Sequence, residues 1–285
     1  MQLGSIHIYP VKGGRALDLD HADVQRAGIA RDRRWMVVDA GDRFVTQREL
    51  PKLALLHAEP DPDGLHLGFE EAGERFVPTP DGAERLTVRV WDDRVEAAVA
   101  DETTNRALSD WLGMPVRLVH QDAGAGREVS PDWAEAGRPV TFADGFPLLV
   151  ANRQSLRALN AEIVGSGSEA VPMGRFRPNV VIDGAEPWAE DGWATIRIGA
   201  VLLDLVKPCA RCTVTTVDQQ TGDVAGSQPL DALRRIRFSA DRRVPGVLFG
   251  WNAVPRGTGR IDVGDFVRVE AERPAGEVVR APRAG

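Results

Sequence analysis

Residues 175–223 read RFRPNVVIDGAEPWAEDGWATIRIGAVLLDLVKPCARCTVTTVDQQTGD. The stretch opens with an Arg-Pro-Asn element and contains both cysteines of the chain, Cys209 and Cys212. On either side of the cysteines lie runs of aliphatic and β-branched residues, which are typical of strands. Any thiolate or soft-metal chemistry of this protein must therefore take place in this stretch.

The residues after the second cysteine bear on what the pair can do. A redox dithiol of the thioredoxin type lies where a strand passes into a helix, whose N-terminus lowers the pKa of the thiol. Here residues 213–217 read TVTTV and are all β-branched, which predicts that Cys212 leads into or lies on a strand. This prediction argues against a redox dithiol.

Other interpretations of the two cysteines differ in plausibility. A structural zinc site needs two more nitrogen or sulfur ligands, and the five histidines lie far upstream without ligand spacing. A disulfide across so short a gap would be strained, and two cysteines in 285 residues do not make a secreted framework. A single thiolate that binds a soft metal or performs sulfur chemistry fits, with Arg211 beside it to favour the ionised form. Two buried cysteines acting as small hydrophobic side chains fit equally well.

Three short motifs in the same stretch resemble one known family. They are F-R-P-N at 176–179, A-E-D-x-W at 189–193 and C-x-R-C-x-x-T-T-V-D at 209–218. Together they resemble the MOSC domain, named after the C-terminal region of molybdenum cofactor sulfurase, and especially the bacterial and mitochondrial amidoxime-reducing enzymes. The resemblance implies that Cys212 is the catalytic protein ligand of molybdenum. It also implies that Arg177 and Asn179 hold the pterin and phosphate of the molybdenum cofactor.

Motifs nearer the N-terminus extend the resemblance. On the residues alone, a lysine in a glycine turn and arginines near a strand edge are solvated charges. However, Y-P-V-K at 9–12 resembles the opening of the MOSC N-terminal β-barrel, which implies cofactor contacts by Lys12 and Gly13. The family often has serine after the lysine, so Gly13 offers only its backbone N–H. R-D-R-x-W at 31–35 resembles the family's phosphate-binding and pterin-binding motif, which implies Arg33.

Three further segments match the family with weaker roles. The turn A-D-G-F-P at 143–147 resembles a D-x-x-P turn that the family places against the pterin. Gly145 and Phe146 lack the hydroxyl groups of relatives, so only main-chain contacts with the cofactor are expected from them. Residues 46–53 resemble a T-x-R-x-x-P segment, and residues 263–267 match the closing V-G-D-x-V strand.

Composition limits the classes of partner. The chain has 285 residues, 43% of them hydrophobic, so it can bury a substantial core. Its net charge of -7 and pI near 5.4 argue against a nucleic-acid partner, because neutralising phosphates needs a basic face. The sequence has no run of 18 apolar residues and no signal-peptide pattern at its start. We therefore expect a cytoplasmic protein that does not bind membranes.

Local patterns predict a mainly β protein with a few short helices. Strands are expected at 3–9, 36–39, 43–46, 53–58, 65–69, 86–91, 95–100, 148–150, 246–254 and 266–269. Helices are expected at 104–112, ending at Gly113, from an N-cap at Asn152 to near Gly165, and at 229–236, with a loop at 121–138. The resemblance implies a MOSC N-terminal β-barrel-like domain at 1–120, packed on a β-barrel MOSC domain at 121–272, with a tail at 273–285.

The resemblance also implies a reaction. It points to a molybdenum-cofactor-dependent oxidoreductase that reduces N-hydroxylated substrates such as hydroxylaminopurines and amidoximes. Some bacterial relatives continue into a ferredoxin-like domain and this chain does not, so a separate ferredoxin-type or flavoprotein-type donor is expected. A second hypothesis is a sulfur carrier that holds a persulfide on Cys212 for delivery to metal-sulfur cofactors. A third treats the arginines as surface charge and the cysteines as core. The arginine motifs, which a persulfide carrier would not need, favour cofactor binding.

Overall fold

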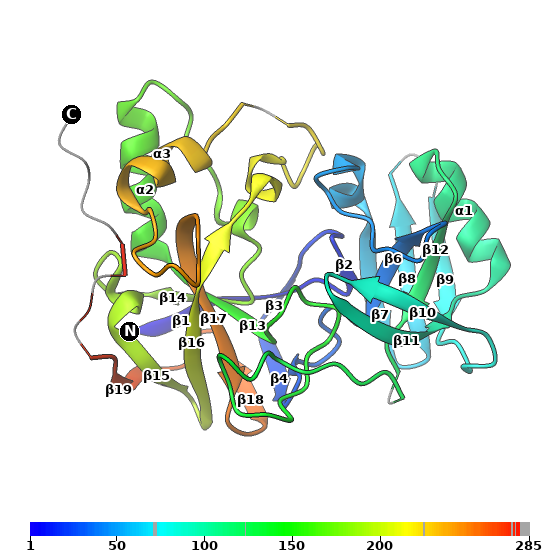
Figure 1. Ribbon diagram of the computed structural model, residues 1–285, viewed down its shortest axis with the longest axis horizontal. Helices are drawn as coiled ribbons and strands as arrows, with labels where there is room; N and C mark the ends of the chain where they lie inside the picture. The colour runs from blue at the N-terminus through cyan, green and yellow to red at the C-terminus, as the bar shows by residue number, and fades with distance from the viewer. Residues whose placement is uncertain (71–72, 123, 225, 275, 277, 280–285) are drawn as a thin grey trace.

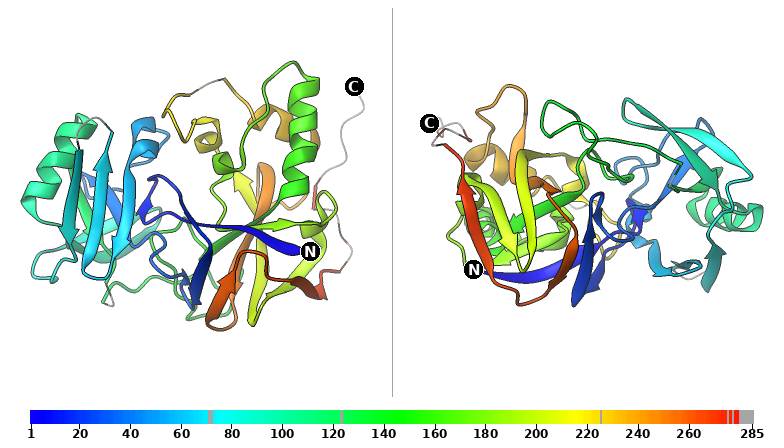
Figure 2. Two further views of the ribbon diagram at one scale, coloured as in Figure 1. Left: turned by 180° about the vertical axis from the view of Figure 1, so that it is seen from behind. Right: turned by 90° about the horizontal axis from the view of Figure 1, so that it is seen from below.

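The computed structural model describes residues 1–70, 73–122, 124–224, 226–274, 276 and 278–279, and its chain forms two lobes that lie side by side (Figure 1). The large-sheet lobe is built on an eight-stranded sheet and the small-sheet lobe on a five-stranded sheet. Views from behind and from below show the same two lobes (Figure 2). The sequence prediction of a mainly β protein with few helices is confirmed.

The large sheet carries the main core of its lobe. Its strands run in the order β19 (Val267–Glu272), β15 (Trp193–Ile198), β16 (Val201–Arg211), β17 (Val247–Pro255), β13 (Leu148–Asn152), β14 (Val180–Asp183), β1 (Gln2–Ile8) and β3 (Leu17–Leu19). A small sheet of β18 (Gly259–Asp262), β4 (His21–Gln25) and β5 (Gly28–Ile29) packs against the same core. Aliphatic side chains such as Ile6, Val180 and Leu203 are fully buried there, and this apolar burial stabilises the lobe.

Two helices, α2 (Arg153–Gly165) and α3 (Leu230–Ile236), pack in a second core cluster of the large-sheet lobe with Phe249 of β17. Asn152 caps α2 as predicted, because its side-chain oxygen accepts a hydrogen bond from the N–H of Gln154 at 2.9 Å. The amide of Asn152 in turn donates to the buried carboxylate of Glu190 at 2.9 Å. The neighbouring Asp191 accepts two hydrogen bonds from Arg237, at 2.7 and 3.0 Å. The A-E-D-x-W motif therefore holds the fold together.

The small-sheet lobe has core on both faces of its sheet. The five strands run in the order β10 (Arg85–Val90), β11 (Asp93–Val99), β12 (Val116–His120), β6 (Trp35–Asp39) and β2 (Val11–Lys12). Beside them lie β7 (His57–Asp61), β8 (Gly64–Phe69), β9 (Gly73–Pro78) and helix α1 (Glu102–Leu112). In β6, Val37 faces one core cluster while Met36 and Val38 face the other. A strand buried on both faces reads as a continuous apolar run, as β6 does.

The start of the chain connects the lobes. β1 pairs with β14, and β3, β4 and β5 also lie in sheets of the large-sheet lobe. Between β1 and β3 the chain crosses over, so that β2 joins β6 in parallel within the small-sheet lobe, and it crosses again between β5 and β6. The domain division at residue 120 remains a prediction. In space, the first strands lie with the second half of the chain, and residues 9–12 lie between the two lobes (Figure 1).

Three local predictions of strands were wrong. Residues 43–46 form no strand and make only two isolated bridges, Val38 with Phe44 and Arg43 with Arg89. Residues 53–58 were expected as a strand, but Pro51–Leu55 form a short 3-10 helix (η1) that begins with proline and precedes β7. Residues 213–217 were also expected as a strand, but Thr213–Thr216 form a 3-10 helix, η4. The hydroxyls of Thr215 and Thr216 donate to the carbonyls of Cys212 and Thr213, at 2.9 and 2.8 Å, and this local bonding competes with extended structure.

Two further observations concern membrane-spanning helices and the C-terminal tail. Within the described ranges, the chain has no helix with the length and apolar character needed to cross a membrane. The predicted tail at 273–285 falls partly outside the described residues. At its start, the Arg273 guanidinium donates to the carbonyls of Trp193 and Leu205, at 2.9 and 2.6 Å, so residue 273 is attached to the large-sheet lobe.

His120 at the end of β12 makes folding stability depend on pH. Its ring lies 4.5 Å from the Trp35 ring, and burial, aided by Arg34, lowers the pKa of His120 from 6.5 to about 4. Between these values the unfolded chain binds a proton that the folded chain does not, so this stability contribution is lost as pH falls from about 6.5 to 4. Between pH 7 and 4.5, we expect the free energy of unfolding of His120→Phe to fall by about 1–2 kcal/mol less than that of wild type.

Urea unfolding at several pH values measures this effect. The difference in free energy of unfolding between wild type and His120→Phe should stay constant between pH 7 and 8, which is the internal control, and shift in favour of the variant below pH 6.5. Parallel curves over the whole range would mean that His120 does not bind a proton differently in the two states.

Candidate functional site

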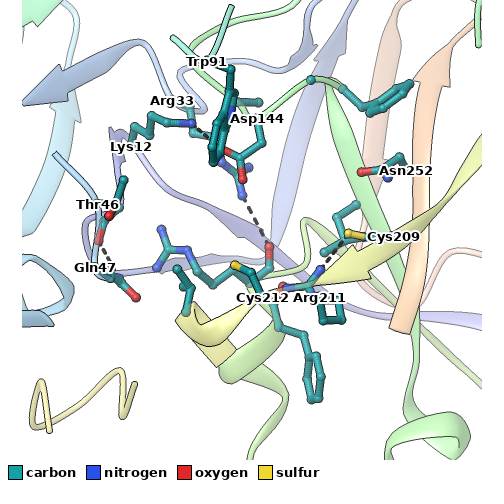
Figure 3. Close-up of a pocket in the computed structure, with 18 of the residues that line it drawn as sticks. Lys12, Arg33, Thr46, Gln47, Trp91, Asp144, Cys209, Arg211, Cys212 and Asn252 are labelled. Atoms are coloured by element: carbon teal, nitrogen blue, oxygen red, sulfur yellow. Dashed lines mark hydrogen bonds and ion pairs between the residues drawn. The ribbon is translucent and has the colours of Figure 1, made fainter. Parts of the chain in front are cut away.

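A cleft lies where the two lobes meet. Counting its open mouth, its empty space is about 970 Å³, which is the size of a small-molecule site. The eight residues predicted from sequence all line this cleft: Lys12, Gly13, Arg33, Gly145, Phe146, Arg177, Asn179 and Cys212. Figure 3 shows part of the lining, with Lys12, Arg33 and Cys212 facing one shared space. The structure thus brings the predicted residues together, and their roles toward a ligand remain predictions.

Two arginines are fixed by the buried ring of Tyr9. The guanidinium carbons of Arg33 and Arg177 lie 4.4 and 4.2 Å from the ring centroid. Burial raises the pKa of Tyr9 to about 12, so its ring stays neutral, and its hydroxyl donates to the carbonyl of Pro178 at 3.0 Å. Arg33 also donates to the carboxylate of Asp32 at 2.5 Å. The sequence analysis named Tyr9 only as the first residue of the Y-P-V-K motif and predicted no function for it.

Both arginines have left-handed backbone conformations, with φ of 48° at Arg33 and 54° at Arg177. This region is costly for a residue with a side chain, and such strain clusters at functional sites. Backbone hydrogen bonds hold it in place, from the Arg33 N–H to Tyr9 at 2.8 Å and from the Arg177 N–H to Gly174 at 3.1 Å. These hydrogen bonds therefore stabilise the otherwise unfavourable backbone conformation of both arginines.

Arg177 has spare hydrogen-bonding capacity. Its Nη1 donates to the side-chain oxygen of Gln219 at 2.8 Å, whereas its Nη2 is buried and without a partner among the described residues. Burial, together with the charge of Arg33, lowers the pKa of Arg177 to about 10, so the guanidinium is still charged at neutral pH. A buried cationic donor without an acceptor is suited to an anionic ligand.

Lys12 already has a carboxylate partner. Its ammonium donates to Asp144 at 2.5 Å and to the carbonyl of Phe142 at 2.8 Å. Burial lowers the pKa of Lys12, and Asp144 opposes that shift. Although burial acts in the other direction, Lys12 and Arg33 hold the pKa of Asp144 well below its usual range. The Asp144 side chain is nevertheless 77% exposed and lines the cleft. A phosphate that binds Lys12 must therefore compete with this carboxylate for the ammonium group.

Cys212 follows the end of β16, and its thiol lies exposed and free at the cleft (Figure 3). Cys209 is also free and lines the same cleft. The prediction that Arg211 lies beside the Cys212 thiol was wrong. Arg211 instead donates to the sulfur of Cys209 at 2.8 Å and to the carbonyl of Phe176 at 2.8 Å. In an extended segment residues i and i+2 share a face, so the Arg211 side chain contacts Cys209 rather than its sequence neighbour Cys212.

The structure explains why a glycine follows Lys12. Gly13 has a φ of 81°, and a Cβ at this position would lie 2.7 Å from Cδ2 of Leu53. A serine here would therefore strain the backbone and displace Leu53. Nearby, Gln47 donates to the Gly13 carbonyl at 2.6 Å and exchanges hydrogen bonds with Gln219 at 3.0 and 2.9 Å. The segment at 46–53, which had no assigned role, thus ties the two lobes together along the cleft.

Among the cleft residues that sequence reasoning did not single out, three have polar or aromatic side chains at the site. Asp144 was quoted only as part of a turn, Trp91 only as the end of a strand, and Asn252 only as part of a strand. The signal available in the sequence was weak, because a tryptophan or asparagine beside a strand has many uses. Their place in the cleft follows from the packing of the two lobes.

Comparison with known proteins identifies the family. Residues 1–115 match the model of the MOSC N-terminal beta barrel domain, and residues 137–268 match that of the MOSC domain. Mitochondrial amidoxime-reducing component 1 of Homo sapiens is 32% identical over 279 residues, which cover 93% of this chain and 82% of that protein. The chain belongs to the MOSC family. The Xenopus laevis protein of the same name is 31% identical over 278 residues, covering 91% of this MOSC chain and 79% of its own.

A second kind of relative shares the MOSC region. Molybdenum cofactor sulfurase of Oryza sativa subsp. japonica is 25% identical over 294 residues, which cover 94% of this chain and 35% of that protein. The relatives thus include a protein named for amidoxime reduction and a protein named for the molybdenum cofactor. This MOSC chain therefore belongs to a family associated with the molybdenum cofactor.

Proposed function

We propose that this MOSC protein binds the molybdenum cofactor and reduces N-hydroxylated compounds with electrons from a separate protein of ferredoxin or flavoprotein type. The observation that carries the proposal is the composition of one cleft. It combines an exposed free thiol at Cys212 with the buried Nη2 of Arg177, which has no partner in the part of the chain that the structure describes. A pterin cofactor with a terminal phosphate needs this combination of a soft ligand and an anion site.

The donor set fits such a cofactor. Lys12, Arg33 and Arg177 would hold the phosphate through charge-assisted hydrogen bonds, and the fixed planar guanidinium groups suit its oxygens. The amide of Asn179 would orient the pterin, together with the main chain of residues 145–146. In the present structure the Asn179 oxygen accepts from Arg33 at 3.1 Å, and its nitrogen donates to the carbonyl of His7 at 3.1 Å, so this side chain is firmly positioned.

Cys212 would bind the metal through its thiolate. When bound, the cofactor supplies the two-electron chemistry of the reaction. Overall, an N–OH group takes up two electrons and two protons, the N–O bond breaks, and the products are N–H and water. The role of the protein is to bind and orient the cofactor and the substrate in a cleft that both lobes shield.

One experiment tests the cofactor and the reaction together. The protein is produced in a host that makes the molybdenum cofactor, its molybdenum is measured by elemental mass spectrometry, and reduction of a hydroxylaminopurine and an amidoxime is followed with a chemical reductant. We expect near-stoichiometric molybdenum and N–O reduction of at least one substrate. Metal-loaded protein that reduces neither compound would refute the reaction, and protein without molybdenum would refute the cofactor.

A sulfur carrier is the second candidate function. It is favoured by the exposed Cys212 thiol and by the similarity to molybdenum cofactor sulfurase. In this case intact mass spectrometry should show one labile extra sulfur on Cys212, and the purified protein should contain no molybdenum. For either function, a cytoplasmic location remains a prediction.

A further inference from the structure

A groove opens directly beside the cleft. Counting its open mouth, its empty space is about 1370 Å³. It shares part of its lining with the cleft, namely Trp91, Asp144, Gly145 and Phe146. Its other walls come from residues 92–94, residues 126–131, Trp133 and Lys207 of β16. A ligand whose reacting end lies in the cleft can therefore extend into this groove.

The groove is lined by the aromatic rings of Trp91, Trp133 and Phe146 and by charges of both signs, some of which are paired. Asp93 is paired with Arg127 at 2.6 Å, and Asp144 is paired with Lys12. The Lys207 ammonium lies 4.9 Å from the ring centroid of Trp133 and 5.7 Å from that of Phe146. Such walls suit a flat, uncharged group better than a strongly charged one.

Trp91 lies at the boundary between the cleft and the groove, because it lines both. β10 and β11 pair up to Val90 and Asp93, which leaves Trp91 and Asp92 as a two-residue turn. Trp91 has a φ of 56°, in the left-handed region that such turns usually fill with glycine. The tryptophan is 44% exposed. A large apolar side chain that is both strained and exposed at the edge of a site indicates a functional use.

The indole is held from the cleft side. The Phe44 ring meets it edge-on at 5.0 Å, and the Arg48 guanidinium lies 5.0 Å from its centroid. Its Nε1 donates a long hydrogen bond to Asp144 at 3.4 Å. Phe44 and Arg48 line the cleft and are not part of the groove lining. The indole is thus fixed in place while it also forms part of the groove wall.

We propose that Trp91 is a stacking platform that selects substrates with an aromatic ring. The ring of an aromatic amidoxime or hydroxylaminopurine lies on the indole in the groove, and its N–OH group points into the cleft. This inference rests on the proposed function. Trp91 positions the substrate and does not take part in breaking the N–O bond.

The test compares two substrates in metal-loaded protein. Wild type, Trp91→Ala and Trp91→Phe are assayed with an aromatic amidoxime and with a small aliphatic amidoxime, using a chemical reductant. Stacking of a flat base on an aromatic side chain corresponds to about 5- to 150-fold in binding. We expect Trp91→Ala to raise KM for the aromatic substrate by about 10-fold or more, with kcat kept within about 2-fold. The aliphatic substrate should be unaffected, and Trp91→Phe should restore most of the difference.

Two control variants separate stacking from folding. Phe76→Ala removes an aromatic side chain of similar exposure, 43%, on β9 of another sheet, and should change neither substrate. Trp91→Gly suits the left-handed turn, so it should keep the thermal midpoint and the molybdenum content while raising KM as Trp91→Ala does. Equal losses for both substrates, or no change for either, would overturn the proposal.

Binding of the product-like aromatic amidine, measured by calorimetry, gives the same comparison without turnover. If wild type binds the amidine and Trp91→Ala binds it at least 10-fold more weakly, the stacking role holds even if no substrate is reduced, and only the proposed reaction fails. If both proteins bind it equally, Trp91 is not the platform. A rise in KM for a protein electron donor, with both amidoximes unaffected, would place Trp91 in a donor surface and also overturn the proposal.

Discussion

Cys212→Ala is expected to lose most of the bound molybdenum and to reduce N–O reduction by at least about 100-fold. The estimate follows because changing groups that only support a metal ligand costs about 10- to 100-fold, and this change removes the proposed ligand itself. The Cys212 side chain is exposed, so the variant should fold normally. Elemental mass spectrometry and steady-state kinetics on protein from a cofactor-producing host measure both effects.

Cys209→Ala is the matched control for this prediction. Cys209 is three residues away, lines the same cleft and is also free, but its sulfur accepts a hydrogen bond from Arg211. We expect this variant to keep its molybdenum and to stay within a few-fold of wild-type activity. Equal losses in both variants would mean that Cys212 has no special role. Loss of a labile sulfur from Cys212→Ala, with no molybdenum in either protein, would favour the sulfur carrier.

The sequence predicted the members of the site better than their contacts. Lys12, Arg33, Arg177 and Cys212 could be named because they stand in short motifs whose order matches a known family. Their convergence in one cleft depends on the crossings of the chain between the lobes, from β1 to β2 and from β5 to β6, which no local pattern indicates. The pairing of Lys12 with Asp144 joins residues 132 positions apart, and only the packing of the two lobes brings them together.

Errors arose where local hydrogen bonding outweighed residue preference. The β-branched run after Cys212 favours a strand by its side-chain shape, yet its threonine hydroxyls bond to nearby carbonyls and close a 3-10 turn. The prediction for Arg211 failed for another reason: adjacent residues of an extended segment point to opposite faces, so Arg211 shares a face with Cys209 and not with Cys212. Helix ends were predicted well, because Asn152 and Gly113 act through their own local chemistry.

Arg177→Gln is expected to change cofactor binding and stability in opposite directions. Loss of a charge-assisted hydrogen bond to phosphate corresponds to about 1.5–3 kcal/mol, so cofactor affinity should fall by about 10- to 150-fold. Without cofactor, however, the arginine is a buried cation with one unpaired nitrogen, close to Arg33. Its removal should raise the stability of the cofactor-free protein by about 1 kcal/mol, or about 2–4 °C in thermal midpoint. Glutamine has no easier access to the left-handed region than arginine, so the backbone strain stays the same.

Arg175→Gln distinguishes this effect from the general loss of a buried arginine. Arg175 lies two residues away, immediately before the F-R-P-N motif. Its Nε is also buried without a partner among the described residues, but its two Nη atoms are used, by Asp218 at 2.9 Å and by the carbonyl of Thr216 at 2.8 Å. Breaking these contacts should lower stability by about 1–3 kcal/mol and leave cofactor affinity nearly unchanged. Thermal unfolding of cofactor-free protein and molybdenum retention during dialysis provide the two readouts. If both variants lose stability alike and retain the metal alike, the spare nitrogen of Arg177 does not serve an anion. Opposite stability changes for these two neighbouring arginines would show that the fold keeps an unfavourable charge in the cleft because a ligand uses it.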